Sequence, residues 1–438
     1  MIKNAPSEQP TLLRALGRWD LAAISLNTII GSGIFLLPAT AASMVGSWAP
    51  LCFVVSGAIS LLFAFSFAEA GSRFTETGGP YLYAKKAFGN FVGFEVAWIF
   101  WASRLAAIGA NYSVSMIYLG YFFPDLAEGW IQTLIITCIV IIVAAANIRG
   151  VRIGSFFTNS FTIAKLVPLV LLVVGGLLVL NWEKASTPTT ISLSDFMRSV
   201  LLVAFAFGGF EVATVPAGEA HNPKQHLPQA LVISIGAAAF LYVLIQFVAY
   251  GLYPDLGASK RPLSDAATSI VGSFGGSLIA VGALISTCGY IFGASLVVPR
   301  VTFALAEQGQ FHPVFAKIHP TFRTPWVSII LHAIISWFLA VGLSFLSLVI
   351  INVLARLVVV GITCGAVIAF QKKHPEQAAI RIPGGVVIPV LGILLVVYLL
   401  LQSSANELLW GVGALSVGTL LYIPLKRYLP VRTQAPAE

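Results

Sequence analysis

Two glycine clusters interrupt long apolar stretches, and such interruptions can expose backbone groups for binding. They are Gly31-Ser32-Gly33 and Gly208-Gly209, and the second is followed by Glu211. Paired glycines each cost about 1 kcal/mol relative to alanine in a helix, and unwound backbone inside hydrocarbon is tolerated where it lines a cavity. Close packing between helices is the alternative explanation for either cluster alone. Two clusters at corresponding positions favour two broken helices.

A first helix that unwinds at residues 31–33 would bind a carboxylate. Where the helix restarts, it presents free backbone N–H groups and the positive end of its dipole, and Ser32 adds a hydroxyl donor. Ile29 and Ile30 precede the break, and we expect them at the same site. A helix that ends at Gly208-Gly209 presents carbonyls, which suit an ammonium group. Together the two breaks predict a site for a zwitterionic amino acid.

Ionisable side chains within apolar stretches are costly to bury and are therefore functional candidates. We expect Lys165 to take the place of a coupling cation and to exchange a proton, with an internal salt bridge as the alternative. Arg104 and Glu211 have opposite charges and could neutralise each other near the ligand, with Glu211 also a candidate for ion coupling; a purely structural ion pair is the alternative. Arg356 is expected to order helix packing. Phe205, one helical turn before the second break, is a candidate aromatic gate, with a core or lipid-facing position as the alternative.

The elements that must position these residues are transmembrane helices. A 438-residue chain with 58% hydrophobic and 10% charged residues lies outside the composition of soluble proteins. A helix needs about 20 mostly apolar residues to cross a bilayer. Twelve such segments are expected, at approximately 19–44, 48–70, 91–122, 130–148, 157–180, 196–218, 229–252, 275–305, 326–345, 348–370, 386–403 and 407–424. The fold class is therefore an all-α membrane protein.

The distribution of basic residues predicts the orientation. With both termini cytoplasmic, seventeen Lys and Arg residues near the span ends lie inside and four lie outside. This asymmetry follows the positive-inside rule, so the net charge of +8 does not indicate a nucleic-acid partner. We expect a multi-pass protein of the cell membrane, that is, the inner or plasma membrane.

Five spans separate the two breaks, which is the spacing of an inverted repeat of five plus five helices. No loop is long enough to fold alone. The expected organisation is a cytoplasmic tail at 1–18, one transporter domain at 19–428 with repeats at about 19–180 and 196–370 and extra helices at 386–424, and a cytoplasmic tail at 429–438. The segment 253–274 is expected to form short interfacial helices.

The sequence resembles the amino acid, polyamine and organocation transporters. The matching stretches read IGSGIFLLP at 30–38, FTIAKLVPL at 161–169 and FAFGGFEVATVPAGEAHNPKQHLP at 205–228. The resemblance implies a leucine-transporter-like fold with alternating access around the two broken helices. It implies carboxylate binding at Gly31-Ser32-Gly33, amine binding around Phe205, Gly208 and Gly209, and a Lys165 that substitutes for the sodium ion of sodium-driven members. Glu211 matches an acidic residue of cationic amino acid exchangers, whereas Arg104 stands where those exchangers have a small residue, which disfavours a dicationic substrate.

We therefore expect a secondary transporter of neutral or small polar amino acids that works as a proton symporter or an exchanger without sodium. The alternatives are a polyamine or basic amino acid antiporter of the same family and a non-transporting amino acid sensor. No enzyme, cofactor or metal site is expected, because no metal-ligand spacing or nucleophile arrangement lies in the spans. The expected partners are the amino acid, protons and the lipid bilayer, and no sequence signal sets an oligomeric state. The four cysteines are interpreted as small core residues.

Overall fold

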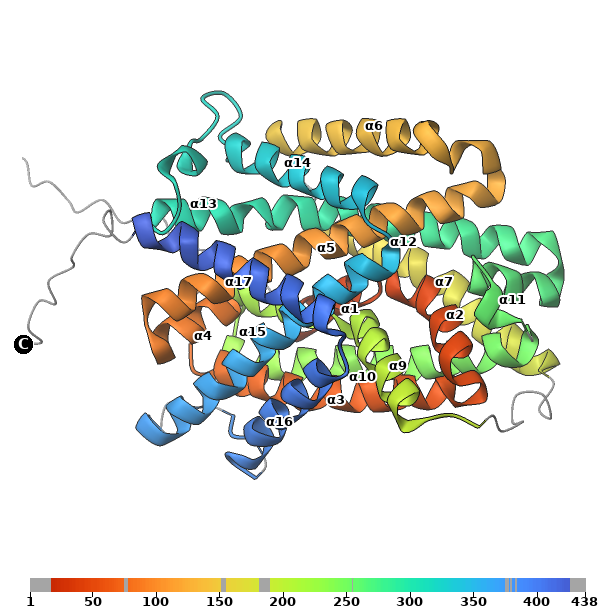
Figure 1. Cartoon of the computed structure of the whole chain (residues 1–438), viewed down its shortest axis with the longest axis horizontal. Coiled ribbons are helices and arrows are strands. Elements are labelled where there is room, and N and C mark those ends of the chain that lie inside the picture. Colours follow the sequence, from red (N-terminus) through yellow and green to blue (C-terminus); the bar gives the residue numbers. More distant parts are fainter. Residues whose placement is uncertain are drawn as a thin grey trace, which may run out of the picture.

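The computed structural model describes residues 17–74, 78–150, 155–180, 190–253, 255–374, 378, 380–382 and 384–425. Every regular element in these ranges is a helix, and most of the long helices run along one direction of the molecule (Figure 1). The expected tail at 429–438 lies outside the described residues, and so does nearly all of the tail at 1–18.

The first expected span consists of two helices, α1 (Arg18–Ile29) and α2 (Gly33–Val45). Ile30 leaves helical geometry with a ψ of 86°, and the helix resumes at Gly33. The interruption therefore coincides with the first glycine cluster.

The sixth expected span is also divided. It begins as α9 (Leu193–Val203), whose first turn is capped by the Ser192 hydroxyl accepting from the Asp195 N–H at 3.0 Å. The chain then tightens into the 3₁₀ helix η3 (Ala204–Phe207), turns at Gly208-Gly209, and continues as the 3₁₀ helix η4 (Phe210–Glu219). Gly209 has a φ of 109°, a backbone conformation that glycine adopts far more readily than other residues. The second half of this span is thus 3₁₀ rather than α-helical.

The other expected spans each coincide with one helix or with two consecutive helices. A break between α14 and α15 falls at the expected division of residues 326–370, and α11 lies in the segment where short interfacial helices were predicted. The remaining helices are η1 (Gly46–Trp48), α3 (Ala49–Ser72), α4 (Gly79–Phe88), α5 (Asn90–Phe122), η2 (Pro124–Leu126), α6 (Gly129–Ile148), α7 (Ser155–Val179), α10 (Pro223–Leu252), η5 (Leu256–Ala258), α11 (Pro262–Val271), α12 (Ser273–Val297), α13 (Pro299–Glu307), η6 (Pro313–Ala316), α14 (Trp326–Gly342), α15 (Phe345–Lys373), α16 (Val387–Leu401) and α17 (Ala405–Leu425).

Many of these helices are apolar enough for a bilayer. Seven helical stretches among the described residues have the length and composition to cross a membrane, and three shorter helices are also apolar. The outer helices α6 and α7 expose large apolar side chains, such as Trp130 and Leu178, that suit contact with lipid. The chain is therefore a multi-pass membrane protein.

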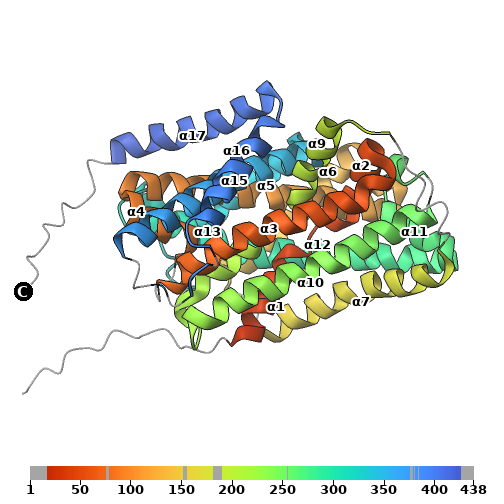
Figure 2. The same ribbon diagram turned by 90° about the horizontal axis from the view of Figure 1, so that it is seen from below.

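The two broken helices contact each other in the interior. Figure 2 shows α3, α10 and α7 side by side, and α1 contacts both α10 and α7. A Cβ at Gly33 would lie 2.8 Å from Cα of Ala206, and one at Gly209 would lie 2.5 Å from the carbonyl oxygen of Thr28. The Thr28 hydroxyl also donates to the Gly209 carbonyl at 3.0 Å. Glycine at these positions lets the backbones approach closely, so the packing role and the break coexist.

The core assignment of the cysteines is correct for Cys52 and Cys364, which are buried, but wrong for Cys138, which is exposed, while Cys288 is intermediate. Cys138 lies on the peripheral helix α6, where few residues are buried. An apolar segment alone does not reveal which of its faces points toward lipid.

Candidate functional site

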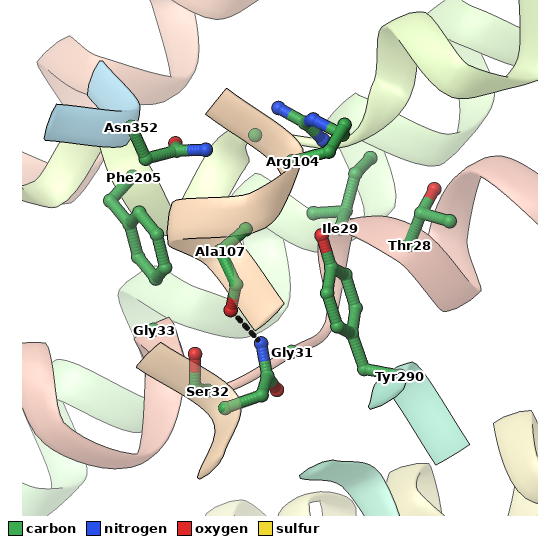
Figure 3. A pocket seen from close by; sticks show the side chains of 12 residues that line it. Thr28, Ile29, Gly31, Ser32, Gly33, Arg104, Ala107, Phe205, Tyr290 and Asn352 are labelled. Atoms are coloured by element: carbon green, nitrogen blue, oxygen red, sulfur yellow. Dashed lines mark hydrogen bonds between the residues drawn. The ribbon is translucent and has the colours of Figure 1, made fainter. Parts of the chain in front are cut away.

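A small cavity lies where the two breaks meet (Figure 3). Its walls come from five places: the break between α1 and α2, the middle of α5, the turn after η3, α12 and α15. The lining residues are Thr28, Ile29, Gly31, Ser32, Gly33, Arg104, Ala107, Asn111, Phe205, Gly208, Tyr290 and Asn352.

One wall of the cavity is suited to an anion. Ser32 is the N-cap of α2, yet its hydroxyl makes no capping bond, and Ser32 Oγ is buried without a hydrogen-bond partner among the described residues. Gly31 and Gly33 place no side chain between the cavity and the start of α2. The first N–H groups of a helix have no partner within the helix and lie at its positive dipole end. This wall therefore offers donors and no cation of its own.

Another wall offers an acceptor. Asn111 on α5 donates from Nδ2 to the Ala107 carbonyl at 2.8 Å, the contact drawn as a dashed line in Figure 3. This bond fixes the amide, so Oδ1 is the free end, and it is buried without a partner among the residues that the structure describes. The cavity thus contains one unsatisfied donor, on Ser32, and one unsatisfied acceptor, on Asn111.

Lys165 of α7 binds the end of α1. Its Nζ donates to the carbonyls of Asn27 and Ile30, each at 2.8 Å, and the side chain is fully buried. Ser286 also donates to the Ile30 carbonyl, at 3.3 Å, and the Tyr242 hydroxyl donates to the Ile29 carbonyl at 3.1 Å. The negative dipole end of α1 is therefore capped by a cation, and Lys165 forms no ion pair with a described carboxylate.

Arg104 and Glu211 form a buried ion pair with an N–O distance of 2.8 Å. The other oxygen of Glu211 accepts from the Gly209 N–H at 3.1 Å, which ties the carboxylate to the second break. Arg104 lines the cavity, whereas Glu211 does not. The pair that the sequence suggested thus exists, with the arginine on the cavity side.

Arg356 of α15 occupies the end of the first half of the sixth span. Its Nη2 donates to the Ala204 carbonyl at 2.5 Å, and its side chain is buried. The Gly208 N–H donates to the Phe205 carbonyl at 2.9 Å. The expectation of open carbonyls at this helix end needs correction, because two of them already have donors.

Phe205 lines the cavity and packs edge-to-face on Phe345, with ring centroids 6.1 Å apart. Ile30 and Gly209, which the sequence assigned to the site, lie behind the lining and contribute their carbonyls to Lys165 and Thr28.

Sequence reasoning missed five lining residues: Thr28, Ala107, Asn111, Tyr290 and Asn352. The asparagines carried a usable signal, since an amide within an apolar span is costly unless it has a partner. Asn352 has one, the Ser103 carbonyl at 2.7 Å. Ala107 and Tyr290 carried no comparable signal.

Comparison with known proteins places this geometry in a family. The family model described as amino acid permease matches residues 16–414. The methylthioribose transporter of Bacillus subtilis (strain 168) is 26% identical over 97% of this chain and 96% of its own length. The serine/threonine exchanger SteT of the same organism is 30% identical over 74% of this chain and 75% of its own length. The branched-chain amino acid permease BcaP, also of Bacillus subtilis (strain 168), is 27% identical over 97% of this chain and 95% of its own length. The chain therefore belongs to the amino acid permease family of membrane transporters and is not an enzyme.

Proposed function

We propose that the protein carries small amino acids across the cell membrane by alternating access, without sodium, as a proton symporter or an exchanger. The observation that carries this proposal is the pair of unsatisfied atoms in one cavity, Ser32 Oγ and Asn111 Oδ1. A buried polar group without a partner costs free energy, so a ligand that supplies both partners is favoured. A carboxylate accepts from Ser32 and from the start of α2, and an ammonium group donates to Asn111.

The inverted repeat of five plus five spans within twelve, with both termini cytoplasmic, belongs to the same proposal. It is supported by matching cation contacts in the two halves. Lys165, from the fifth expected span, caps the carbonyl end of the broken first span. Arg356, from the tenth, caps the carbonyl end of the broken sixth span. An inverted repeat places such contacts at equivalent positions.

Lys165 also supports coupling without sodium. Its ammonium group already binds two carbonyl oxygens, those of Asn27 and Ile30, which are the kind of ligand that a hard cation would use. A lysine can release and rebind a proton, and a sodium ion cannot. We therefore assign Lys165 to ion coupling, and Glu211, through Arg104, to the substrate side of the same machinery.

Small neutral or polar substrates agree with the names of two relatives, a serine/threonine exchanger and a branched-chain amino acid permease. The antiporter of polyamines or basic amino acids is disfavoured, because Arg104 in the lining and Arg356 behind it repel a second positive charge. Phe205 is proposed as the gate, since its ring forms part of the cavity wall.

The test is uptake of radiolabelled amino acids by purified protein in liposomes, with a proton gradient or with unlabelled amino acid inside. We expect Ser32→Ala and Asn111→Ala each to raise the amino acid concentration that gives half-maximal uptake by about 10- to 100-fold. Each variant loses a hydrogen bond to a charged group of the ligand. Ser113→Ala is the matched control, because Ser113 lies on the same helix as Asn111 but outside the cavity lining, and its hydroxyl donates to the Gly109 carbonyl. Absence of uptake for all twenty amino acids under both conditions would refute the proposal. Binding without transport would indicate a sensor.

A further inference from the structure

The charges around the cavity do not balance. Arg104 is paired with Glu211, but Arg356 and Lys165 form no ion pair with any carboxylate in the described part of the chain. Even with Lys165 uncharged, two guanidinium groups face a single carboxylate. A buried charge without a counterion is costly, so the site retains one excess positive charge for a ligand to neutralise.

Arg356 is held in a fixed orientation with one nitrogen unused. Nη2 is bound to the Ala204 carbonyl, whereas Nη1 is buried and has no hydrogen-bond partner among the described residues. Nη1 lies against Gly208, since a Cβ there would stand only 2.3 Å from it. Gly208 itself lines the cavity and places no side chain of its own between Nη1 and the cavity, although Arg356 is not a lining residue. The unused N–H groups therefore lie directly behind the cavity wall.

The guanidinium group of Arg356 also interacts electrostatically with other side chains around the cavity. Tyr290, which lines the cavity, interacts electrostatically with Arg104, Glu211 and Arg356. Arg356 in turn interacts with Glu211, Arg104 and Tyr290. Three charged side chains, Arg104, Glu211 and Arg356, therefore share one buried region with the neutral Tyr290, so a ligand charge placed against Gly208 is felt by both arginines.

A zwitterion carries no net charge and leaves the excess in place, whereas a ligand with one further carboxylate removes it. We infer that the substrate is an acidic amino acid. Its α-carboxylate binds at Ser32 and its ammonium group binds at Asn111. Its side-chain carboxylate binds Arg356 Nη1 beside Gly208. The inference rests on the proposed amino acid transport but departs from the neutral or small polar substrates considered under that proposal, because such substrates leave the excess charge in place. Arg356 becomes a specificity-determining residue as well as a helix cap.

Isosteric pairs test this directly, because glutamate and glutamine, or aspartate and asparagine, differ in charge and hardly in size. In proteoliposomes of the wild-type protein, the acidic member of a pair should inhibit uptake of a radiolabelled amino acid at a concentration at least about tenfold lower than its amide does. Uptake of glutamine with equal or better affinity would overturn the substrate class and leave amino acid transport standing. Failure of every amino acid would overturn both.

Two variants assign the preference to Arg356. Arg356→Gln should reduce the glutamate-to-glutamine preference to about one, whereas Arg356→Lys should retain part of it. Arg198→Gln is the control, because it removes a guanidinium of α9 that pairs with Glu407 outside the cavity lining, and it should leave the ratio unchanged. An unchanged ratio in Arg356→Gln, in protein whose thermal unfolding is still shifted by glutamine, would overturn the assignment. If Arg356→Gln does not fold, a preference of the wild-type protein for glutamine over glutamate would overturn the assignment to Arg356 instead.

Discussion

Replacement of Lys165 by alanine should destabilise the broken first span. The ammonium group donates two buried hydrogen bonds of 2.8 Å, to Asn27 and Ile30. A hydrogen bond to a charged group contributes about 1.5–3 kcal/mol, so the two together contribute about 3–6 kcal/mol. Ile30 keeps Ser286 as a weaker donor at 3.3 Å, so we expect a loss near the lower end of that range.

The free energy of unfolding can be measured by equilibrium denaturation of the purified protein in detergent. Lys165→Ala should lower it by about 3 kcal/mol. The control is Lys260→Ala, which removes an exposed lysine and should stay within about 0.5 kcal/mol of the wild type. A Lys165→Ala protein as stable as the control would refute the capping argument.

Transport by the same variant tests the coupling role. Wild-type uptake should accelerate when a proton gradient is imposed, and Lys165→Ala should lose this response, because the variant lacks the ammonium group that binds the Asn27 and Ile30 carbonyls. The vacated carbonyls of Asn27 and Ile30 are suitable ligands for a small cation, so partial rescue by sodium would strengthen the interpretation. A proton response that survives in Lys165→Ala would exclude this lysine from coupling.

Two further predictions concern the breaks and the ion pair. Arg104→Gln and Glu211→Gln should each lower the free energy of unfolding by about 3–5 kcal/mol, since each leaves an unpaired buried charge. The double variant should lose less than the sum of the two single losses. Strict additivity in this double-mutant cycle would contradict a coupled pair. Gly33→Ala should abolish uptake, because its Cβ would lie 2.8 Å from the backbone of Ala206. The control is Gly236→Ala, which should transport normally because a Cβ there meets nothing within 4 Å. Uptake by Gly33→Ala at the wild-type rate would contradict the close approach of the two spans.

The helices and their interruptions could be predicted from local sequence. Long apolar runs define the helices because each must satisfy its own backbone in lipid, whatever its neighbours are. The glycines of residues 31–33 and Gly208-Gly209 mark the breaks because they weaken a helix locally. Lys165, Arg104 and Glu211 were found for a related reason, since a charge within an apolar run is costly wherever it is packed.

The partners of these groups were decided by the tertiary structure alone. The sequence left Arg356 as a packing residue, and only its contact with Ala204, 152 positions away, makes it a helix cap with an unused nitrogen. The free oxygen of Asn111 is likewise defined by the bond that its nitrogen makes and by the cavity wall that it joins. Residue type sets what a side chain can bind, but the packing of helices distant in sequence sets what it does bind. The sequence by itself therefore determined that a polar site interrupts the membrane helices, and the fold decided its charge balance.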